Sequence, residues 1–145
     1  MRRVVLDSSV VAKWLPILSH EPLVREAREL RRQWETGEIV IAAPDFFWVE
    51  VAAILWKAQR RGICTVAAAE TALKDLLSLN IPTVDSYSLM EATLQAAIRY
   101  ERSVCDSVYI ALARALDAEF LTADETLVNA VSRRLPVEWL GTFSA

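Results

Sequence analysis

Four carboxylates, far apart along the chain, are the side chains best suited to chemistry. Asp7 and Asp124 each follow a predicted strand, whereas Glu50 and Asp106 lie in the early turns of predicted helices. In an open parallel sheet such positions meet at the carboxyl edge of the strands. Two carboxylates ~5 Å apart repel by about 3 kcal/mol at an effective dielectric of 20, so a cluster of them favours a bound cation.

The ligand chemistry of this cluster predicts which cation it would hold. Oxygen ligands without His or Cys select a hard ion, so the expected cofactor is Mg²⁺ or Mn²⁺ rather than Zn²⁺. Such an ion in an open acidic pocket serves phosphoryl chemistry, since it activates water and stabilises the attacking and leaving oxygens. The alternative is that two or more of these acids are helix N-caps or surface charges.

The elements that must position the acids alternate between strands and helices. Apolar runs predict strands over 4–6, 39–42, 119–122 and 137–140, with an irregular edge strand over 81–84. Helical spacing predicts helices over 8–14, 21–35, 44–61, 65–80, 88–100, 103–116 and 124–134, with Ser88 and Glu91 at capping-box spacing. The middle helices, 65–100, are expected to form a protruding pair. This alternation indicates a single α/β domain over residues 1–145, with a mainly parallel central sheet flanked by helices.

Composition narrows the class of protein further. With 145 residues, 54% of them hydrophobic and only three Gly, the chain suits one folded domain rather than a disordered segment. The longest uncharged stretch, 76–84, is far shorter than the ~20 apolar residues that span a bilayer. No secretion signal is recognised, so we expect a cytoplasmic protein without a membrane partner, with Cys64 and Cys105 as reduced, half-buried thiols.

Charge and hydrophobicity also bear on partners. The net charge of −3 argues against broad, charge-driven coating of nucleic acid, although it is compatible with a nuclease whose acids are gathered in one place. The apolar excess is high for a small domain, which predicts an interface with a second subunit or a partner.

Four segments resemble the successive motifs of the PIN-domain family. They are VVLDSSVVAKW at 4–14, Pro44 with Glu50 and Val51, DSVYIALA at 106–113, and FLTAD at 120–124. The closest similarity is to the VapC toxins of toxin–antitoxin pairs, and it extends over essentially the whole chain. The resemblance implies an Mg²⁺- or Mn²⁺-dependent endoribonuclease that cleaves RNA and is neutralised by a VapB-type antitoxin. Proteins of this kind are commonly homodimers.

The same resemblance assigns roles to the four acids. It makes Asp7, Glu50, Asp106 and Asp124 the catalytic residues. Asp7, Asp106 and Asp124 would hold the metal, and Glu50 would complete the shell or orient the attacking water.

Neighbouring positions both agree with the family and depart from it. Ser8 and Thr122 match positions where relatives often have small hydroxyl residues that support the acids. Ala53 stands where many relatives have Asn, and Cys105 stands where they have an aromatic residue. These departures concern substrate contacts rather than the acids.

Two other function classes remain open on sequence grounds. One is a phosphotransfer or phosphohydrolase domain with an Asp-based site, although no second Asp follows two residues after Asp7 and no Lys follows a late strand. The other is a non-catalytic binding module whose acids cap its elements.

A row of residues on the predicted helix 44–61 suggests how RNA could approach. Glu50, Ile54, Lys57 and Arg61 fall on one stripe, which places Lys57 ~10 Å and Arg61 ~16 Å along the helix axis from Glu50. These cations could follow an RNA backbone, or they could simply be a solvated helix end. His20 lies outside the acidic motifs, so we expect a loop or helix-entry role for it.

Overall fold

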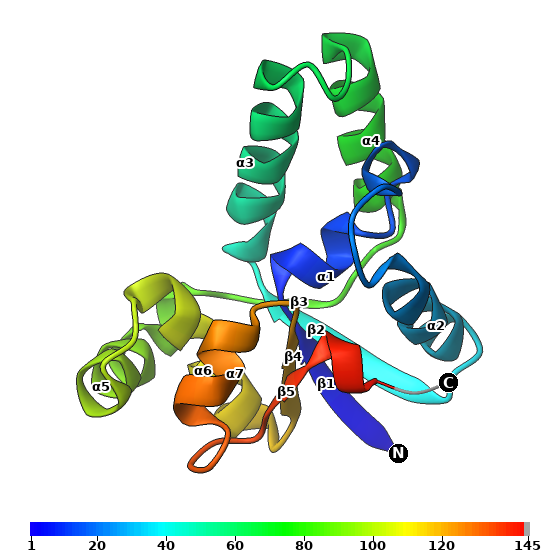
Figure 1. Cartoon of the computed structure of the whole chain (residues 1–145). Coiled ribbons are helices and arrows are strands. Elements are labelled where there is room, and N and C mark those ends of the chain that lie inside the picture. The colour runs from blue at the N-terminus through cyan, green and yellow to red at the C-terminus, as the bar shows by residue number, and fades with distance from the viewer. Residues whose placement is uncertain (144–145) are drawn as a thin grey trace.

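A five-stranded, all-parallel sheet forms the centre of the structure, a computed structural model that describes residues 1–143 (Figure 1). The strand order is β3-β2-β1-β4-β5. The strands are β1 (Arg2–Leu6), β2 (Ile39–Pro44), β3 (Thr83–Val84), β4 (Glu119–Thr122) and β5 (Val137–Trp139). The predicted fold class, an α/β fold with a parallel sheet, is therefore confirmed.

Seven α-helices and three short 3₁₀ turns connect the strands within the described part of the chain. The helices are α1 (Ser8–Ala12), α2 (Val24–Glu35), α3 (Phe47–Arg60), α4 (Val66–Ser78), α5 (Met90–Tyr100), α6 (Val104–Leu116) and α7 (Glu125–Val131). The turns are η1 (Pro16–Leu18), η2 (Tyr87–Leu89) and η3 (Leu140–Thr142). No helix within residues 1–143 is long and apolar enough to span a bilayer.

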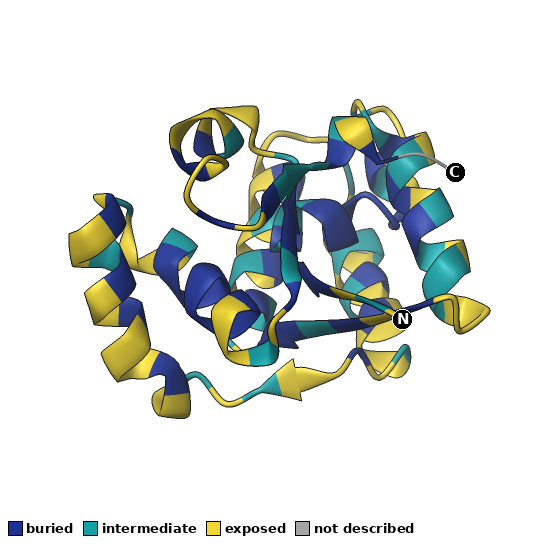
Figure 2. Ribbon diagram, turned by 90° about the horizontal axis from the view of Figure 1, so that it is seen from below, coloured by how far each residue is buried: buried dark blue, intermediate teal, exposed yellow. Residues whose placement is uncertain are grey.

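The central strands form because their residues are buried on both faces of the sheet. Val4, Val5 and Leu6 of β1 are at most 2% exposed, and Phe120 and Leu121 of the neighbouring β4 are equally buried. Such unbroken apolar runs are typical of parallel strands covered by helices on both sides. Figure 2 shows these buried strands at the centre and exposed residues on the outer faces of the helices.

Helix α6 covers one face of the sheet, with α5 and α7 beside it, and α2 lies on the other face (Figure 1). The seven consecutive residues Ser107–Ala113 of α6 are all buried, because α6 packs against β1, β2 and β4 and also against α5. A helix that is buried nearly all round loses the polar stripe that would reveal its orientation in the sequence.

The arrangement of the middle helices differs from the expectation. The protruding pair consists of α3 and α4, which project side by side from the sheet, whereas α5 packs against α6 (Figure 1). Thr65 caps α4 as its side chain accepts a hydrogen bond from the Ala68 amide. The capping box at Ser88 is wrong, since Ser88 donates to the Asp85 carbonyl in a turn and α5 begins only at Met90.

Candidate active site

The four acids occupy the carboxyl edge of the three central strands. Asp7 follows β1 and Asp124 closely follows β4, each at the N-cap position of the next helix. Glu50 lies in the first turn of α3, after β2, and Asp106 lies in the first turn of α6. Because β1 pairs with both β2 and β4, the sheet order brings these elements to neighbouring positions.

Asp7 is held by hydroxyl groups and does not cap its helix. Its Oδ2 atom accepts hydrogen bonds from Ser9 Oγ and Thr122 Oγ1, both at 2.8 Å, and it makes no side-chain cap of α1. Ser8 Oγ lies 3.4 Å from Oδ1, which is at the limit of a hydrogen bond. The main serine partner is therefore Ser9 and not the expected Ser8, while Thr122 has the expected supporting role.

Thr122 links two of the acids. It is fully buried, and while its hydroxyl donates to Asp7, its Oγ1 atom accepts the backbone N–H of Asp124 at 3.0 Å. Asp124 also caps α7, because its Oδ1 accepts the Leu127 amide at 3.1 Å. The interpretation of an acid as an N-cap thus applies to Asp124, an exposed residue, and not to Asp7.

Glu50 has a buried aromatic partner that the sequence analysis did not identify. The hydroxyl of Tyr109 donates a hydrogen bond to Glu50 Oε1. Tyr109 is 1% exposed, and its ring stacks on Phe120 with 5.1 Å between ring centroids. Tyr109 follows Asp106 by three residues on α6, so the two residues share a helix face. This spacing could have indicated from the sequence that Tyr109 lies beside the acids.

The electrostatics of the site favour a positive ligand. Burial raises the pKa of Asp7 and the negative charge of Asp106 adds to this, whereas the Ser9 and Thr122 hydroxyls oppose it. Burial likewise raises the pKa of Glu50, and the charges of Asp7 and Asp106 raise it further against the Tyr109 hydrogen bond.

Asp106 follows the same pattern. Burial raises the pKa of Asp106, and Asp124 raises it further, while the hydroxyl of Ser103 and the charge of Arg102 oppose the shift. Within residues 1–143, none of the four acids forms an ion pair with a Lys, Arg or His. Mutually repelling carboxylates without a cationic partner are most stable when a cation joins them.

The residues present fit a hard divalent cation. Every candidate ligand is a carboxylate oxygen, and the hydroxyls of Ser9 and Thr122 already fix one oxygen of Asp7. Among the described residues, no three Asp, Glu, His or Cys side chains lie close enough together to form a complete metal-binding group. The acids are therefore neighbours around a shared edge, coupled through their charges, rather than a completed ligand shell.

Comparison with known families decides the classification. The PIN domain family matches residues 4–131, which is most of the chain. The chain belongs to the PIN domain family. The predicted membership is confirmed, and the matched region contains all four acids. No curated protein is similar enough in sequence to count as a match.

Solved structures share the fold of this PIN domain. PAE2754 from Pyrobaculum aerophilum superimposes with a TM-score of 0.68 at 20% identity, covering 97% of this chain and 85% of the other. VapBC2 from Rickettsia felis, bound to a DNA fragment from its promoter, gives 0.67 at 14% identity, with coverages of 94% and 98%. VapC20 from Mycobacterium tuberculosis, a toxin that cleaves the sarcin–ricin loop, gives 0.63 at 20% identity, with coverages of 88% and 95%.

An ion pair with a buried lysine was also missed. Lys13, at the end of α1, is 5% exposed, and its Nζ atom lies 3.6 Å from Oε2 of Glu21. A lysine is rarely this buried without a partner, but nothing in its sequence context separates it from surface lysines.

Cys64 and Cys105 are free, as expected, although Cys105 is exposed.

Proposed function

We propose that this PIN domain is a metal-dependent endoribonuclease and the toxin of a VapBC-type toxin–antitoxin pair. The observation that carries the proposal is the convergence of Asp7, Glu50 and Asp106, whose charges act on one another and which form no ion pair within the described chain. The structural likeness to an RNA-cleaving toxin, VapC20, supports RNA as the substrate.

The acids divide the work according to their surroundings. Asp7, Asp106 and Asp124 would hold Mg²⁺ or Mn²⁺. When bound, such an ion lowers the pKa of water and stabilises the attacking and leaving oxygens of an in-line displacement. Burial raises the pKa of Glu50, and the hydrogen bond from Tyr109 fixes its carboxylate in place, where it would orient the attacking water. Cleavage would leave 5′-phosphate and 3′-hydroxyl ends.

The experiment compares two site variants with a matched control. We expect Asp7→Asn and Asp106→Asn to abolish Mn²⁺-dependent cleavage of end-labelled RNA, with the fold retained by circular dichroism. Asp75→Asn makes the same chemical change on the exposed surface of α4 and should leave cleavage unchanged. Full activity of either site variant would refute the assignment.

Two further measurements separate the alternatives. Stable acyl phosphate at Asp7 would indicate phosphotransfer, although Ser9 occupies the position where aspartyl phosphatases have a second Asp. If calorimetry detects no Mg²⁺ or Mn²⁺ binding by the wild-type chain, the nuclease proposal is wrong and a binding module is favoured.

The proposed partners follow from the surface and the neighbours. Met90, Leu94 and Ile98 recur every four residues on α5 and are 41%, 58% and 71% exposed. Such a row supports a covered face, supplied by a second copy in a homodimer or by a VapB-type antitoxin. We place the protein in the cytoplasm, where RNA and antitoxin are present. Light scattering of the chain, alone and co-expressed with the adjacent upstream reading frame, measures both assemblies.

A further inference from the structure

A cavity of about 240 Å³ lies beside the second half of α3 and begins one helical turn beyond Glu50, at Ile54. Its polar lining consists of His20 and Glu21, which lie in the turns before α2, Lys57 on α3, and Arg61 at the C-cap of α3. Apolar side chains, including Ile54, complete the lining. The exposed His20, for which the sequence predicted a loop or helix-entry role, thus also lines this cavity.

The α3 side of this cavity continues the stripe that begins at Glu50. Ile54, Lys57 and Arg61 all line the cavity, so the structure brings the predicted row together with a second segment of the chain. With the 1.5 Å rise of an α-helix, Lys57 lies ~10 Å and Arg61 ~16 Å beyond Glu50. Both cations are exposed, and neither forms an ion pair with any residue between 1 and 143.

Four arginines elsewhere in the described chain are neutralised by ion pairs. On α2, Arg31 pairs with Glu35 at 2.7 Å, and Arg32 pairs with both Glu29 and Glu38. Exposed pairs of this kind leave little net field for a charged ligand.

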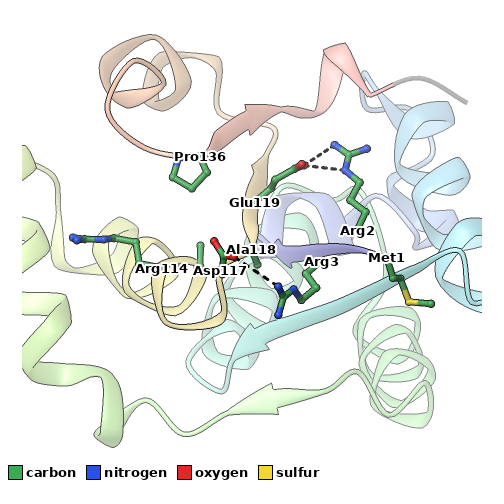
Figure 3. Close-up of a pocket in the computed structure, with 9 residues that line it drawn as sticks. Met1, Arg2, Arg3, Arg114, Asp117, Ala118, Glu119 and Pro136 are labelled. Carbon is green, nitrogen blue, oxygen red and sulfur yellow. Dashed lines mark hydrogen bonds and ion pairs between the residues drawn. The ribbon is translucent and has the colours of Figure 1, made fainter.

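A second cavity, of about 490 Å³, shows the same compensation at the opposite edge of the sheet (Figure 3). There Arg2 binds Glu119 and Glu138, and Arg3 lies 3.7 Å from Asp117. Lys57 and Arg61 differ from these paired arginines, because neither forms an ion pair within the described chain.

The single carboxylate of the α3 cavity is balanced from inside the protein. Glu21 pairs with Lys13, whose side chain is 6% exposed and approaches from the core side. This pair cancels the negative charge that would repel an anion, and it leaves the charges of Lys57 and Arg61 available. The cavity is therefore positive in a protein whose net charge is −3.

We propose that this cavity binds backbone phosphates of the RNA strand whose scissile phosphate lies at the acidic site. This inference rests on the proposed function. It names residues that would bind the RNA away from the point of cleavage. At the ~3.4 Å rise per nucleotide of a stacked strand, Lys57 and Arg61 meet phosphates about three and five nucleotides from Glu50. The contacts are independent of base sequence, because they involve only the backbone.

The test measures binding of single-stranded U12 and U4 RNA in the cleavage-deficient Asp7→Asn background. U12 can reach from the acids to the cavity, whereas U4 is too short to hold both. We expect Lys57→Gln combined with Arg61→Gln to weaken U12 binding by ~10-fold and to lower the salt-dependence exponent by ~1.4, with U4 binding unchanged. In the otherwise wild-type chain, the double variant should raise KM with little change in kcat.

A second double variant controls for net charge. Arg114→Gln with Arg133→Gln removes two exposed cations that also lack ion pairs in the described chain, and it should leave the U12 to U4 ratio unchanged. Equal loss in both double variants, or no loss in either, overturns the proposal. Loss of antitoxin binding without loss of U12 binding would make the cavity a protein-binding site and overturns it equally. Failure of the wild-type chain to cleave RNA, with U12 binding still dependent on Lys57 and Arg61, would refute the nuclease alone.

Discussion

Replacing Thr122 with Val tests the idea that one buried hydroxyl supports the acidic site. Valine has nearly the same shape, so the variant removes the hydrogen bond to Asp7 Oδ2 and the acceptor for the Asp124 amide without opening a cavity. We expect the variant to fold, to unfold more easily at neutral pH, and to bind Mn²⁺ more weakly because Asp7 and Asp124 are less firmly oriented.

The size of the effect follows from the two hydrogen bonds. A bond to an ionised carboxylate contributes about 1.5–3 kcal/mol, and a neutral one about 0.5–1.5 kcal/mol. The buried methyl group that replaces the hydroxyl returns about 0.8 kcal/mol, and water can satisfy the exposed Asp124 segment. The expected net loss in the free energy of unfolding is therefore about 2 kcal/mol at pH 7, or roughly 7 °C in Tm.

The pH dependence of this loss has a definite sign. The Thr122 hydroxyl favours the ionised form of Asp7, so its removal raises the folded-state pKa of Asp7 further above the unfolded value. The added destabilisation is complete above the folded-state pKa of Asp7 in the variant and declines as the pH falls below it. It is lost below the folded-state pKa of Asp7 in the wild type, because the unfolded value of ~3.9 is the same for both proteins. The remaining deficit at low pH, about 1 kcal/mol, reflects the hydrogen-bond geometry alone.

Urea unfolding between pH 4 and pH 8, with a chelator present, measures this deficit. Thr122→Ser is the matched control, because it keeps the hydroxyl and loses only a methyl group. A deficit for the valine variant that stays constant with pH would refute the reasoning, and so would a pH-dependent deficit of the same size in the serine variant.

Two further substitutions separate activity from stability. Tyr109→Phe keeps the ring stacked on Phe120 but removes the donor to Glu50, so we expect RNA cleavage to fall ~10-fold and unfolding to become easier by about 1–2 kcal/mol; unchanged cleavage rates would contradict a role in positioning Glu50. Gly37 has φ +77°, and no atom lies within 4 Å of the place where a Cβ would stand, so Gly37→Ala should cost about 1 kcal/mol in urea unfolding through backbone strain alone, and cleavage should remain normal.

The sheet and the placement of the acids could be predicted because both depend on local patterns. The predicted strand at 119–122 matches β4 to the residue. The predicted strand at 39–42 matches the start of β2, which continues for two more residues, to Pro44. Apolar, β-branched runs bounded by turn residues define such strands without knowledge of the partner strand. Once the strands are parallel, the positions after them must share one edge, which is why Asp7 and Asp124 were identified from topology.

Other features depend on contacts between distant segments, which no local pattern encodes. Ser88 and Glu91 have the spacing of a capping box. In the structure, however, Ser88 lies in η2 and its hydroxyl donates a hydrogen bond to the carbonyl of Asp85. The partner of α4 could not be known either, because an apolar stripe does not specify which helix covers it. Tyr109 reads as a core residue, and its hydroxyl becomes informative only when Glu50 is placed beside it.

The hydrogen-bond partners of the acids show that most of them do not serve as helix N-caps, which favours a bound cation. A cluster serving only as caps would direct its carboxylates at helix amides, as Asp124 does, and would gain nothing from mutual proximity. Asp7 and Glu50 are instead held by buried hydroxyls, which stabilise a carboxylate without neutralising it. An arginine at this edge would relieve the repulsion and would also occupy the position that a metal ion needs. No cation of the described chain forms an ion pair with these acids, and without the four acids the net charge of the chain becomes +1. This separation of charge is the arrangement expected of an enzyme that recruits a metal ion to one end of α3 and a polyanion along the other.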